Sequence, residues 1–186
     1  MALPLHCVEA GTAGAPSLVF LHGGGLSGRQ WQPQLDALKE FHLLAPDLPE
    51  QGRSAHLRPF TLDGAADAVA ELVRTRATEG RAHIIGLSLG GAVGLTLMRK
   101  TPELVSSLFV SGTAAGLGKI LGMISLGSAW IYKLIPPRQL VALSVKQFGI
   151  PPEYAKTFGD DLVIGASAEF TRSYTRALME MVLPSK

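Results

Sequence analysis

Short apolar stretches of strand length alternate with helical patterns over the first 112 residues, and this alternation limits the fold more than any other feature. The segments between the stretches place apolar residues three and four positions apart, which is the helical period. Strands separated by helices predict parallel strands in one sheet that helices cover on both faces. We therefore predict an α/β protein, a three-layer α/β/α sandwich with a mostly parallel sheet. The predicted strands lie in residues 3–11, 17–23, 41–48, 82–88 and 106–112.

Two of the predicted helices have recognisable boundaries. The first, within residues 27–40, has Trp31, Leu35 and Leu38 on one face and Ser27 as its N-terminal cap. The second lies within residues 61–80, where Gly80 is suited to end it. A third helix, rich in small residues, follows Ser88 and is expected to pack closely on the sheet. Its composition is seen in "LGGAVGLTLMRKT".

The pattern changes at about residue 114, where strand-like stretches stop and helical stretches broken by proline and glycine begin. We predict two regions on this basis. Residues 1–114 form the core, and residues 115–186 form a helical cap that ends before the chain returns to the core. The cap helices either pack on the core alone or also line a substrate pocket, and the sequence leaves both alternatives open.

The composition argues against several classes of protein. The chain has 186 residues, 47% of them hydrophobic, and a net charge of +2, which suits one domain with its own core. Its single cysteine, Cys7, excludes an internal disulfide framework and argues against redox and structural zinc sites. We therefore expect no metal and no cofactor. Basic residues are interspersed with acidic ones and aromatic residues are few, so no nucleic-acid partner is expected.

The distribution of apolar residues also bears on location. The first residues lack a basic segment followed by a long apolar run, which argues against a secretory signal. The longest apolar stretch, residues 104–132, is divided by Lys119 into parts shorter than the roughly 20 residues that a membrane span needs. We expect a cytoplasmic protein with no membrane association.

Ser88 lies in the sequence Gly86-Leu87-Ser88-Leu89-Gly90, between a predicted strand and a predicted helix. A G-x-S-x-G pattern in this context is typical of a sharp turn that exposes a serine nucleophile at the edge of a sheet. The flanking glycines are needed because strand and helix approach closely there. The free N–H groups of the first helical turn then point at an oxyanion formed on the substrate. A serine that merely starts a helix is the alternative.

The sequence His22-Gly23-Gly24-Gly25 follows another predicted strand and is expected at the same edge of the sheet as Ser88. The N–H groups of Gly24 and Leu89 are then suited to form a two-donor oxyanion hole. A phosphate-binding loop and a plain connecting turn are the alternatives. The first is disfavoured because the lysine and the spacing of a P-loop are absent.

Three motifs in this order resemble the α/β-hydrolase superfamily: "FLHGGG" at residues 20–25, "APDLPEQGRS" at 45–54 and "IIGLSLGGAV" at 84–93. The resemblance implies a metal-free serine hydrolase that cleaves an ester, an amide or a related bond. By this resemblance Ser88 is the nucleophile, and Gly24 and Leu89 supply oxyanion N–H groups. It covers residues 4–111, and residues 112–186 resemble the start of the helical cap that many members insert.

Asp47 and Glu50 belong to the second motif. We interpret Asp47 mainly as a side chain that stabilises its loop by accepting backbone N–H bonds. Glu50 stands where relatives often have glycine, so the turn is expected to be strained or reshaped. Glu50 and Arg53 are otherwise interpreted as solvated loop charges.

The resemblance also implies a catalytic acid and a histidine that this sequence does not supply at the expected positions. In this superfamily the order is serine, acid, histidine, yet all five histidines precede Ser88. We interpret His6, His42 and His83 as structural or surface residues and His22 as a residue that orders its loop, and His56 remains a weak substitute base. No aspartate follows the strand at 106–112, where "VSGTAAG" is uncharged. The chain is therefore expected to lack the acid and the histidine of the site.

The last two strands of the superfamily fold also have no counterpart. The strand at 106–112 is then an open sheet edge, and self-association through that edge is expected. We hypothesise that the chain is the N-terminal part of a longer hydrolase. A catalytically inactive fragment or pseudoenzyme that acts as a binding module is the alternative, and completion of the site by another chain is a third. The substrate is expected to be a small apolar molecule, because the cap offers the aromatic residues Trp130, Tyr132, Phe148, Phe158 and Phe170.

Overall fold

The computed structural model describes residues 4–113 and 150–165, together with Gln139, Ala142, Val145, Lys146, Ser173, Arg176 and Ala177. Most of the predicted cap lies outside the described residues, including four of the aromatic residues expected to line a pocket: Trp130, Tyr132, Phe148 and Phe170. The boundary between core and cap therefore stays a prediction.

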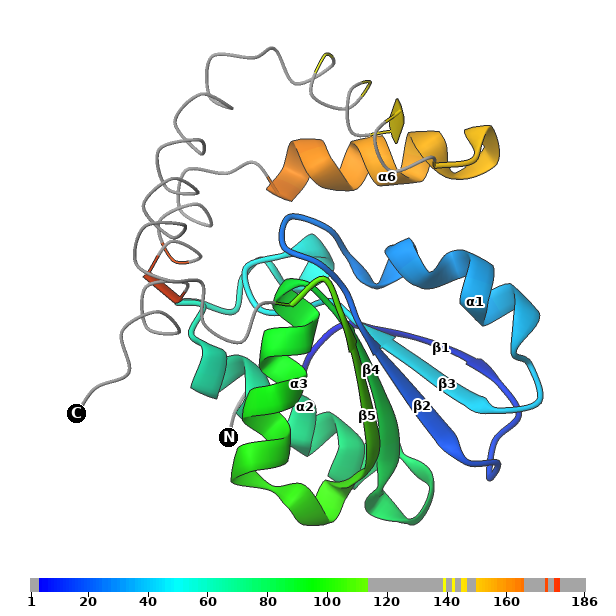
Figure 1. The fold of residues 1–186 in the computed structure, drawn as a ribbon, viewed down its shortest axis with the longest axis vertical. Coiled ribbons are helices and arrows are strands. Elements are labelled where there is room, and N and C mark those ends of the chain that lie inside the picture. The colour runs from blue at the N-terminus through cyan, green and yellow to red at the C-terminus, as the bar shows by residue number, and fades with distance from the viewer. Residues whose placement is uncertain are drawn as a thin grey trace.

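A five-stranded sheet forms the centre of the described region, with the strand order β1-β3-β2-β4-β5 (Figure 1). β1 pairs with β3 in the antiparallel sense, and the other neighbouring strands are parallel. This confirms the predicted mostly parallel sheet. The strands are β1 (Cys7–Gly11), β2 (Ser17–Leu21), β3 (His42–Pro46), β4 (Ala82–Leu87) and β5 (Val105–Ser111).

Helices cover both faces of this sheet, as expected for a three-layer sandwich (Figure 1). α2 (Leu62–Arg76) and α3 (Leu89–Lys100) pack on one face, where they bury the larger apolar cluster with Val19 and Ile84. α1 (Gln32–Ala37) covers the other face, where Phe20 and Leu43 belong to a smaller cluster. Short 3₁₀ turns also occur between these helices and strands: η1 (Gly28–Trp31), η2 (Gly52–Ser54), η3 (Thr78–Gly80) and η4 (Pro102–Leu104).

The predicted helix boundaries are confirmed in part. The Ser27 hydroxyl accepts the Arg29 N–H at the start of η1, so the predicted cap is present. The second helix was predicted to end at Gly80, but α2 ends at Arg76. Gly80 instead closes the following turn η3 with a φ of 64°. The helical period of the sequence stops at Val73, and Ala77 is the one apolar residue between Val73 and Gly80, so the sequence pattern does not mark where the helix ends.

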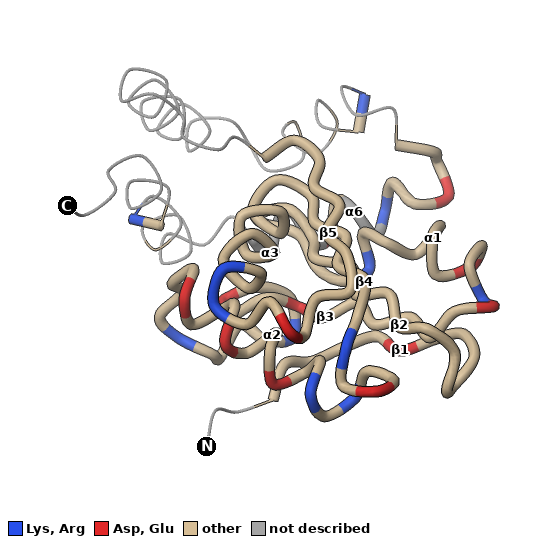
Figure 2. Tube along the Cα trace, turned by 60° about the horizontal axis from the view of Figure 1, so that its bottom comes forward, with Lys and Arg blue, Asp and Glu red and all other residues tan. Residues whose placement is uncertain are grey.

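β5 is an edge strand of the described sheet. Its inner side pairs with β4, and no other described strand pairs with its outer side. Phe109 is 63% exposed and Val110 is 37% exposed. β5 also carries no charged residue, in contrast to the charged surface of α2 (Figure 2).

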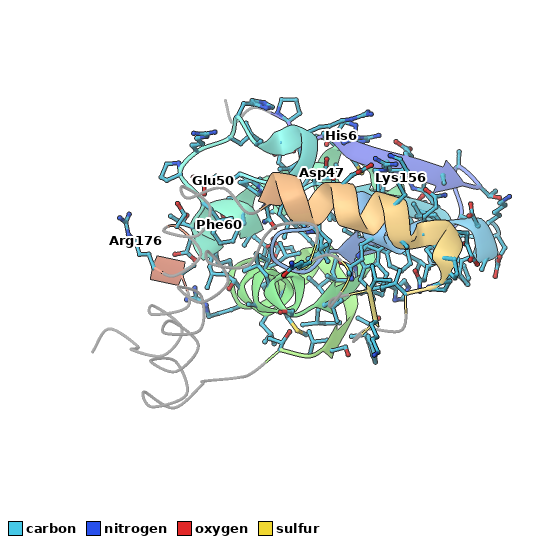
Figure 3. The ribbon with its side chains drawn as sticks, turned by 90° about the horizontal axis from the view of Figure 1, so that it is seen from above. His6, Asp47, Glu50, Phe60, Lys156 and Arg176 are labelled. Atoms are coloured by element: carbon cyan, nitrogen blue, oxygen red, sulfur yellow. The ribbon has the colours of Figure 1, made fainter. Side chains whose placement is uncertain are left out.

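α6 (Pro152–Gly165) lies over the edge of the sheet at which β2 and β4 end (Figure 1). Figure 3 looks down on this edge, with α6 crossing over it. Further along the chain, the Ser173 hydroxyl donates to the Glu50 carboxylate at 3.2 Å, and Ala177 is buried in the larger apolar cluster. Segments of the predicted cap thus contact the core on the side where the candidate site lies. Among the described residues, no helix is both long and apolar enough to span a bilayer.

Candidate active site

Ser88 occupies a strained turn between β4 and α3. Its backbone has a φ of 51° and a ψ of −112°, a conformation that residues other than glycine rarely adopt. A Cβ atom on Gly90 would lie 2.1 Å from the Leu21 carbonyl oxygen, and one on Gly86 would lie 2.6 Å from the Gly91 Cα. Side chains at either position would collide with backbone, which confirms the steric reason predicted for the glycines around Ser88.

The end of β5 holds this turn in place. The Ser88 N–H donates to the Ser111 carbonyl at 2.8 Å. The Thr113 hydroxyl donates to the Ser88 carbonyl, also at 2.8 Å. Sequence reasoning missed Thr113, because a threonine in an uncharged segment such as "VSGTAAG" carries no signal of this contact.

The loop after β2 lies directly beside the serine turn. β2 and β4 are parallel neighbours with Leu21 opposite Gly86, so their C-terminal ends meet at one edge of the sheet. A Cβ atom on Gly23 would lie 3.9 Å from the Leu87 carbonyl oxygen. Gly24 and Ser88 are both half-buried, whereas Gly23, Gly25 and Leu89 are buried. The predicted site residues Ser88, Gly24 and Leu89 are therefore brought to one place.

His22 is fully buried and joins this loop to the loop after β3. Its Nδ1 lies 2.8 Å from the Gly23 carbonyl oxygen, and its Nε2 accepts the Leu48 N–H at 2.9 Å. These partners require a neutral ring with its proton on Nδ1. Burial lowers the pKa of His22, which also favours the neutral form. Both ring nitrogens are occupied, so His22 orders the loop, as predicted, and has no free lone pair for the Ser88 proton.

Asp47 stabilises the same pair of loops. Its carboxylate accepts the Gly28 N–H at 2.7 Å and the Arg53 N–H at 2.8 Å. The side chain is buried, with His6 Nδ1 at 3.1 Å from Oδ2. The predicted role of Asp47 as an acceptor of backbone N–H bonds is confirmed.

Glu50 differs from its interpretation as a solvated charge. Its φ is 62°, the left-handed conformation that glycine adopts without strain. One carboxylate oxygen accepts the Ser173 hydroxyl, while Oε2 is buried and has no hydrogen-bond partner. The backbone of Glu50 thus has a conformation typical of glycine, and one oxygen of its carboxylate is buried in the protein.

The remaining histidines of the described region form no hydrogen bond with the Ser88 side chain. His6 lies beside Asp47 (Figure 3), but β1 is three strand positions from β4, which is roughly 14 Å at about 4.8 Å per strand. His83 pairs with Ser107 and points from the opposite end of β4. His56 is exposed. Within the described residues, no histidine forms a hydrogen bond with the Ser88 side chain, as the order of residues in the sequence predicted.

A serine, a histidine and a carboxylate are joined by short contacts at the opposite edge of the sheet. The Ser17 hydroxyl is 2.9 Å from His42 Nδ1, and His42 Nε2 is 2.8 Å from the Glu9 carboxylate. Ser17 also accepts the Thr78 N–H at 2.8 Å and is buried. A buried hydroxyl that already accepts a backbone N–H is inaccessible to a substrate, so this chain of bonds ties β1, β2 and β3 together.

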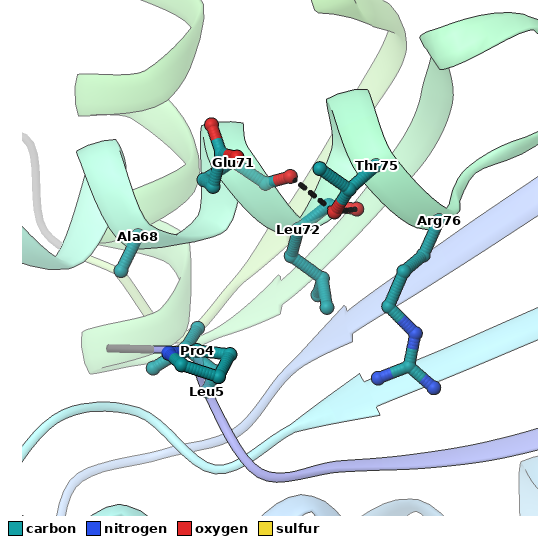
Figure 4. Close-up of a pocket in the computed structure, with 7 residues that line it drawn as sticks. All are labelled: Pro4, Leu5, Ala68, Glu71, Leu72, Thr75 and Arg76. Atoms are coloured by element: carbon teal, nitrogen blue, oxygen red, sulfur yellow. Dashed lines mark hydrogen bonds between the residues drawn. The ribbon is translucent and has the colours of Figure 1, made fainter. Parts of the chain in front are cut away.

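A pocket of about 180 Å³ lies between the N-terminal segment and α2, away from Ser88 (Figure 4). Two of its polar side chains already have partners, because Thr75 donates to the Glu71 carbonyl and Arg76 is paired with Glu9. Cys7 is no alternative nucleophile, since burial raises the pKa of its thiol to about 12. The serine turn thus remains the strongest candidate site of the described region.

The chain belongs to the α/β hydrolase family, whose model matches residues 18–184. It is 38% identical over 101 residues to an AB hydrolase superfamily protein of Gibberella zeae, a match that covers 53% of this chain and 36% of that protein. It is 32% identical over 117 residues to Lipase LipV of Mycobacterium tuberculosis, covering 63% of this chain and 44% of the lipase. The matched part is thus less than half the length of these relatives.

Solved structures show the same fold. The crystal structure of an enol-lactonase from Burkholderia xenovorans superposes with a TM-score of 0.72 at 22% identity. The superposition covers 94% of this chain and 69% of the lactonase. At this level of identity the likeness establishes the fold alone.

Proposed function

We propose that the chain carries the nucleophile and the oxyanion hole of a serine hydrolase, with Ser88 as the nucleophile and the N–H groups of Gly24 and Leu89 as the oxyanion donors. The observation that carries this proposal is the strained backbone of Ser88 beside a glycine loop at the shared end of two parallel strands. Strain of this kind persists only where the surroundings impose it, and it is concentrated at functional sites.

The proposed reaction is acyl transfer to water. Ser88 Oγ attacks the carbonyl carbon of the substrate, and the carbonyl oxygen gains negative charge between the Gly24 and Leu89 N–H groups. The bond to the leaving group then breaks, the serine proton passes to that group, and water cleaves the acyl-serine ester. Relatives named lipase and pimeloyl-[acyl-carrier protein] methyl ester esterase favour an ester as the substrate class.

Proton transfer is the weak part of this site. A serine hydroxyl needs a base to become a good nucleophile, and no described histidine contacts Ser88. We therefore expect the isolated chain to react with activated electrophiles and to turn over esters slowly, because an oxyanion hole without a base retains only residual catalysis.

A fluorophosphonate probe tests this proposal, because its phosphoryl oxygen occupies the oxyanion hole when the serine attacks phosphorus. Intact-mass and peptide analysis is expected to find one label per chain, on Ser88. Ser88→Ala is expected to abolish the label, whereas the matched variant Ser106→Ala, on exposed β5, keeps it. A folded chain that stays unlabelled, or a label that survives in Ser88→Ala, would contradict the proposal.

The second candidate function is self-association through β5. The large apolar side chains that are exposed in the described region gather on α3 and β5: Leu95, Met98, Phe109 and Val110. We propose that a second copy of the chain pairs with β5 in the antiparallel sense, which joins two sheets about a twofold axis. With Leu108 at the axis, Ser107 faces Phe109 of the other copy. No like charges meet, because the strand is uncharged.

Sedimentation velocity tests the pairing. The wild-type chain is expected to form a dimer at micromolar concentration, and Phe109→Lys to be monomeric, because charge on an edge strand opposes pairing. Ala13→Lys places the same charge in the exposed turn between β1 and β2 and is expected to leave the dimer intact. A monomeric wild type, or a dimer that Phe109→Lys does not weaken, overturns this candidate.

A further inference from the structure

The amide groups of the loop after β2 are divided between the protein and the candidate site. The N–H groups of Gly23, Gly25 and Gly28 donate to side-chain oxygens of Gln30, Gln51 and Asp47, at 3.0, 2.7 and 2.7 Å. Among the hydrogen bonds of the described residues, none uses the Gly24 N–H. The loop thus satisfies the amides on both sides of Gly24 and leaves that one donor for a ligand.

Two peptide planes border Gly24, and each has its own anchor. In the plane between Gly23 and Gly24, the carbonyl oxygen lies 2.8 Å from His22 Nδ1. A trans peptide directs its C=O and N–H in opposite senses, so this contact sets the direction of the Gly24 N–H. The plane between Gly24 and Gly25 is held by the bond from the Gly25 N–H to Gln51. Side-chain sterics do not restrain a Gly-Gly peptide, so a hydrogen bond has to do so.

We infer that Gln51 is a positioning residue for the oxyanion hole: its side-chain oxygen holds the Gly24–Gly25 peptide and thereby fixes one end of the neighbouring Gly23–Gly24 peptide, which carries the Gly24 N–H. This inference rests on the proposed role of Gly24. Without the bond, the Gly24–Gly25 peptide rotates and no longer restrains Gly24 Cα, so the contact with His22 alone holds the Gly23–Gly24 peptide and its N–H. Misplacement of a reacting group by about 1 Å costs on the order of 100-fold in rate.

The burial of Gln51 supports this role. The side chain is fully buried, and its Nε2 has no hydrogen-bond partner. The Gly25 N–H is a donor, so the atom that faces it is the oxygen, which fixes the orientation of the amide. Methionine has nearly the same length and would fill the space without a buried, unpaired N–H group. The chain places glutamine there instead, and the bond to Gly25 is what glutamine adds.

Two substitutions separate positioning from packing. Gln51→Met keeps the shape and removes the acceptor, whereas Gln51→Glu keeps an acceptor and adds a charge. Gln32→Met is the matched control, because Gln32 bonds to Asp36 at the start of α1 and does not contact the loop. Gln30→Met is a second loop variant, which removes the acceptor of Gly23 only. Amide hydrogen exchange and the rate constant for fluorophosphonate labelling of Ser88 are measured for each.

Gln51→Met is expected to speed exchange of the Gly25 amide about tenfold, which corresponds to about 1.4 kcal/mol for one lost hydrogen bond. It is expected to slow labelling by about 10- to 100-fold. Gln51→Glu is expected to keep Gly25 protected and to label faster than Gln51→Met. Gln30→Met is expected to speed exchange at Gly23 and not at Gly25.

Unchanged Gly25 exchange in Gln51→Met overturns the inference. So does the reverse order, in which Gln51→Met behaves as the wild type and Gln51→Glu is impaired, because that is the result expected of packing alone. Failure of the proposed function has a different signature. The wild-type chain then stays unlabelled, while Gly25 exchange still reports whether Gln51 holds the loop.

Discussion

Replacement of Gly90 by alanine is expected to lower the free energy of unfolding by about 3 kcal/mol, at the upper end of the usual cost of overpacking. The new Cβ would lie 2.1 Å from the Leu21 carbonyl oxygen and 2.8 Å from that of His22. Neither atom can move easily, because Leu21 belongs to the central strand β2, which is hydrogen-bonded on both sides. The change would push α3 away from the sheet and displace Ser88 with it.

Urea denaturation measures this effect, with Gly94→Ala as the matched control in the same helix. A Cβ on Gly94 would lie 2.9 Å from Leu108 Cδ1, which is the end of a side chain and can move. Alanine also favours the helix over glycine by about 1 kcal/mol. Gly94→Ala is therefore expected to be nearly neutral. Equal midpoints for the two variants would mean that the close approach at Gly90 does not determine the stability.

The second large expected effect is a loss of folding stability as the pH falls. Burial lowers the pKa of His22, so between the folded and unfolded pKa values the unfolded chain binds more protons than the folded chain. The stability that the neutral ring provides is present above the unfolded pKa of about 6.5 and is lost as the pH falls below it. For one titrating group this slope cannot exceed about 1.4 kcal/mol per pH unit, and we expect the free energy of unfolding to fall as the pH is lowered from 6.5 towards 5.0.

Denaturation at a series of pH values from 7.5 to 5.0 tests this dependence, in a range where carboxylates stay mostly ionised. His22→Gln is expected to be less stable at pH 7.5 and to lose most of the slope, because glutamine does not titrate. His56→Gln removes an exposed histidine and is expected to keep the slope of the wild type. The assignment to His22 fails if the two variants show the same slope.

The sheet was predictable because its signal is local. Each strand is a short apolar run, and β3, buried along its whole length, reads as the continuous stretch "HLLAP". The end of α2 was predicted wrongly, because Gly80 has the positive φ typical of a helix stop but closes a separate turn. A glycine indicates where the chain changes direction, and it does not say which element ends there.

The candidate site was predictable only in its nucleophile and its loop. Ser88, Gly24 and Leu89 belong to contiguous motifs, and their roles stay predictions. Thr113 acts on the serine turn, and Gln51, from within the motif at 45–54, acts on the glycine loop, each through a single hydrogen bond to backbone. A lone threonine or glutamine has no periodicity and no partner in sequence that could reveal such a bond. Contacts of this kind become visible only once the strands have been ordered in space.

The backbone N–H groups of the loop after β2 are oriented when the chain folds, before any substrate binds. The amides of this loop are held by Gln30, Gln51 and Asp47, and the peptide that carries the Gly24 N–H is held by His22. A solvent must reorient its molecules around each new charge, whereas these dipoles are oriented before any substrate arrives. For the loop after β2, that orientation is set by residues between His22 and Gln51 once the chain has folded. In the proposed acyl-transfer site, the groups that stabilise the oxyanion are thus separable from the groups that would move protons.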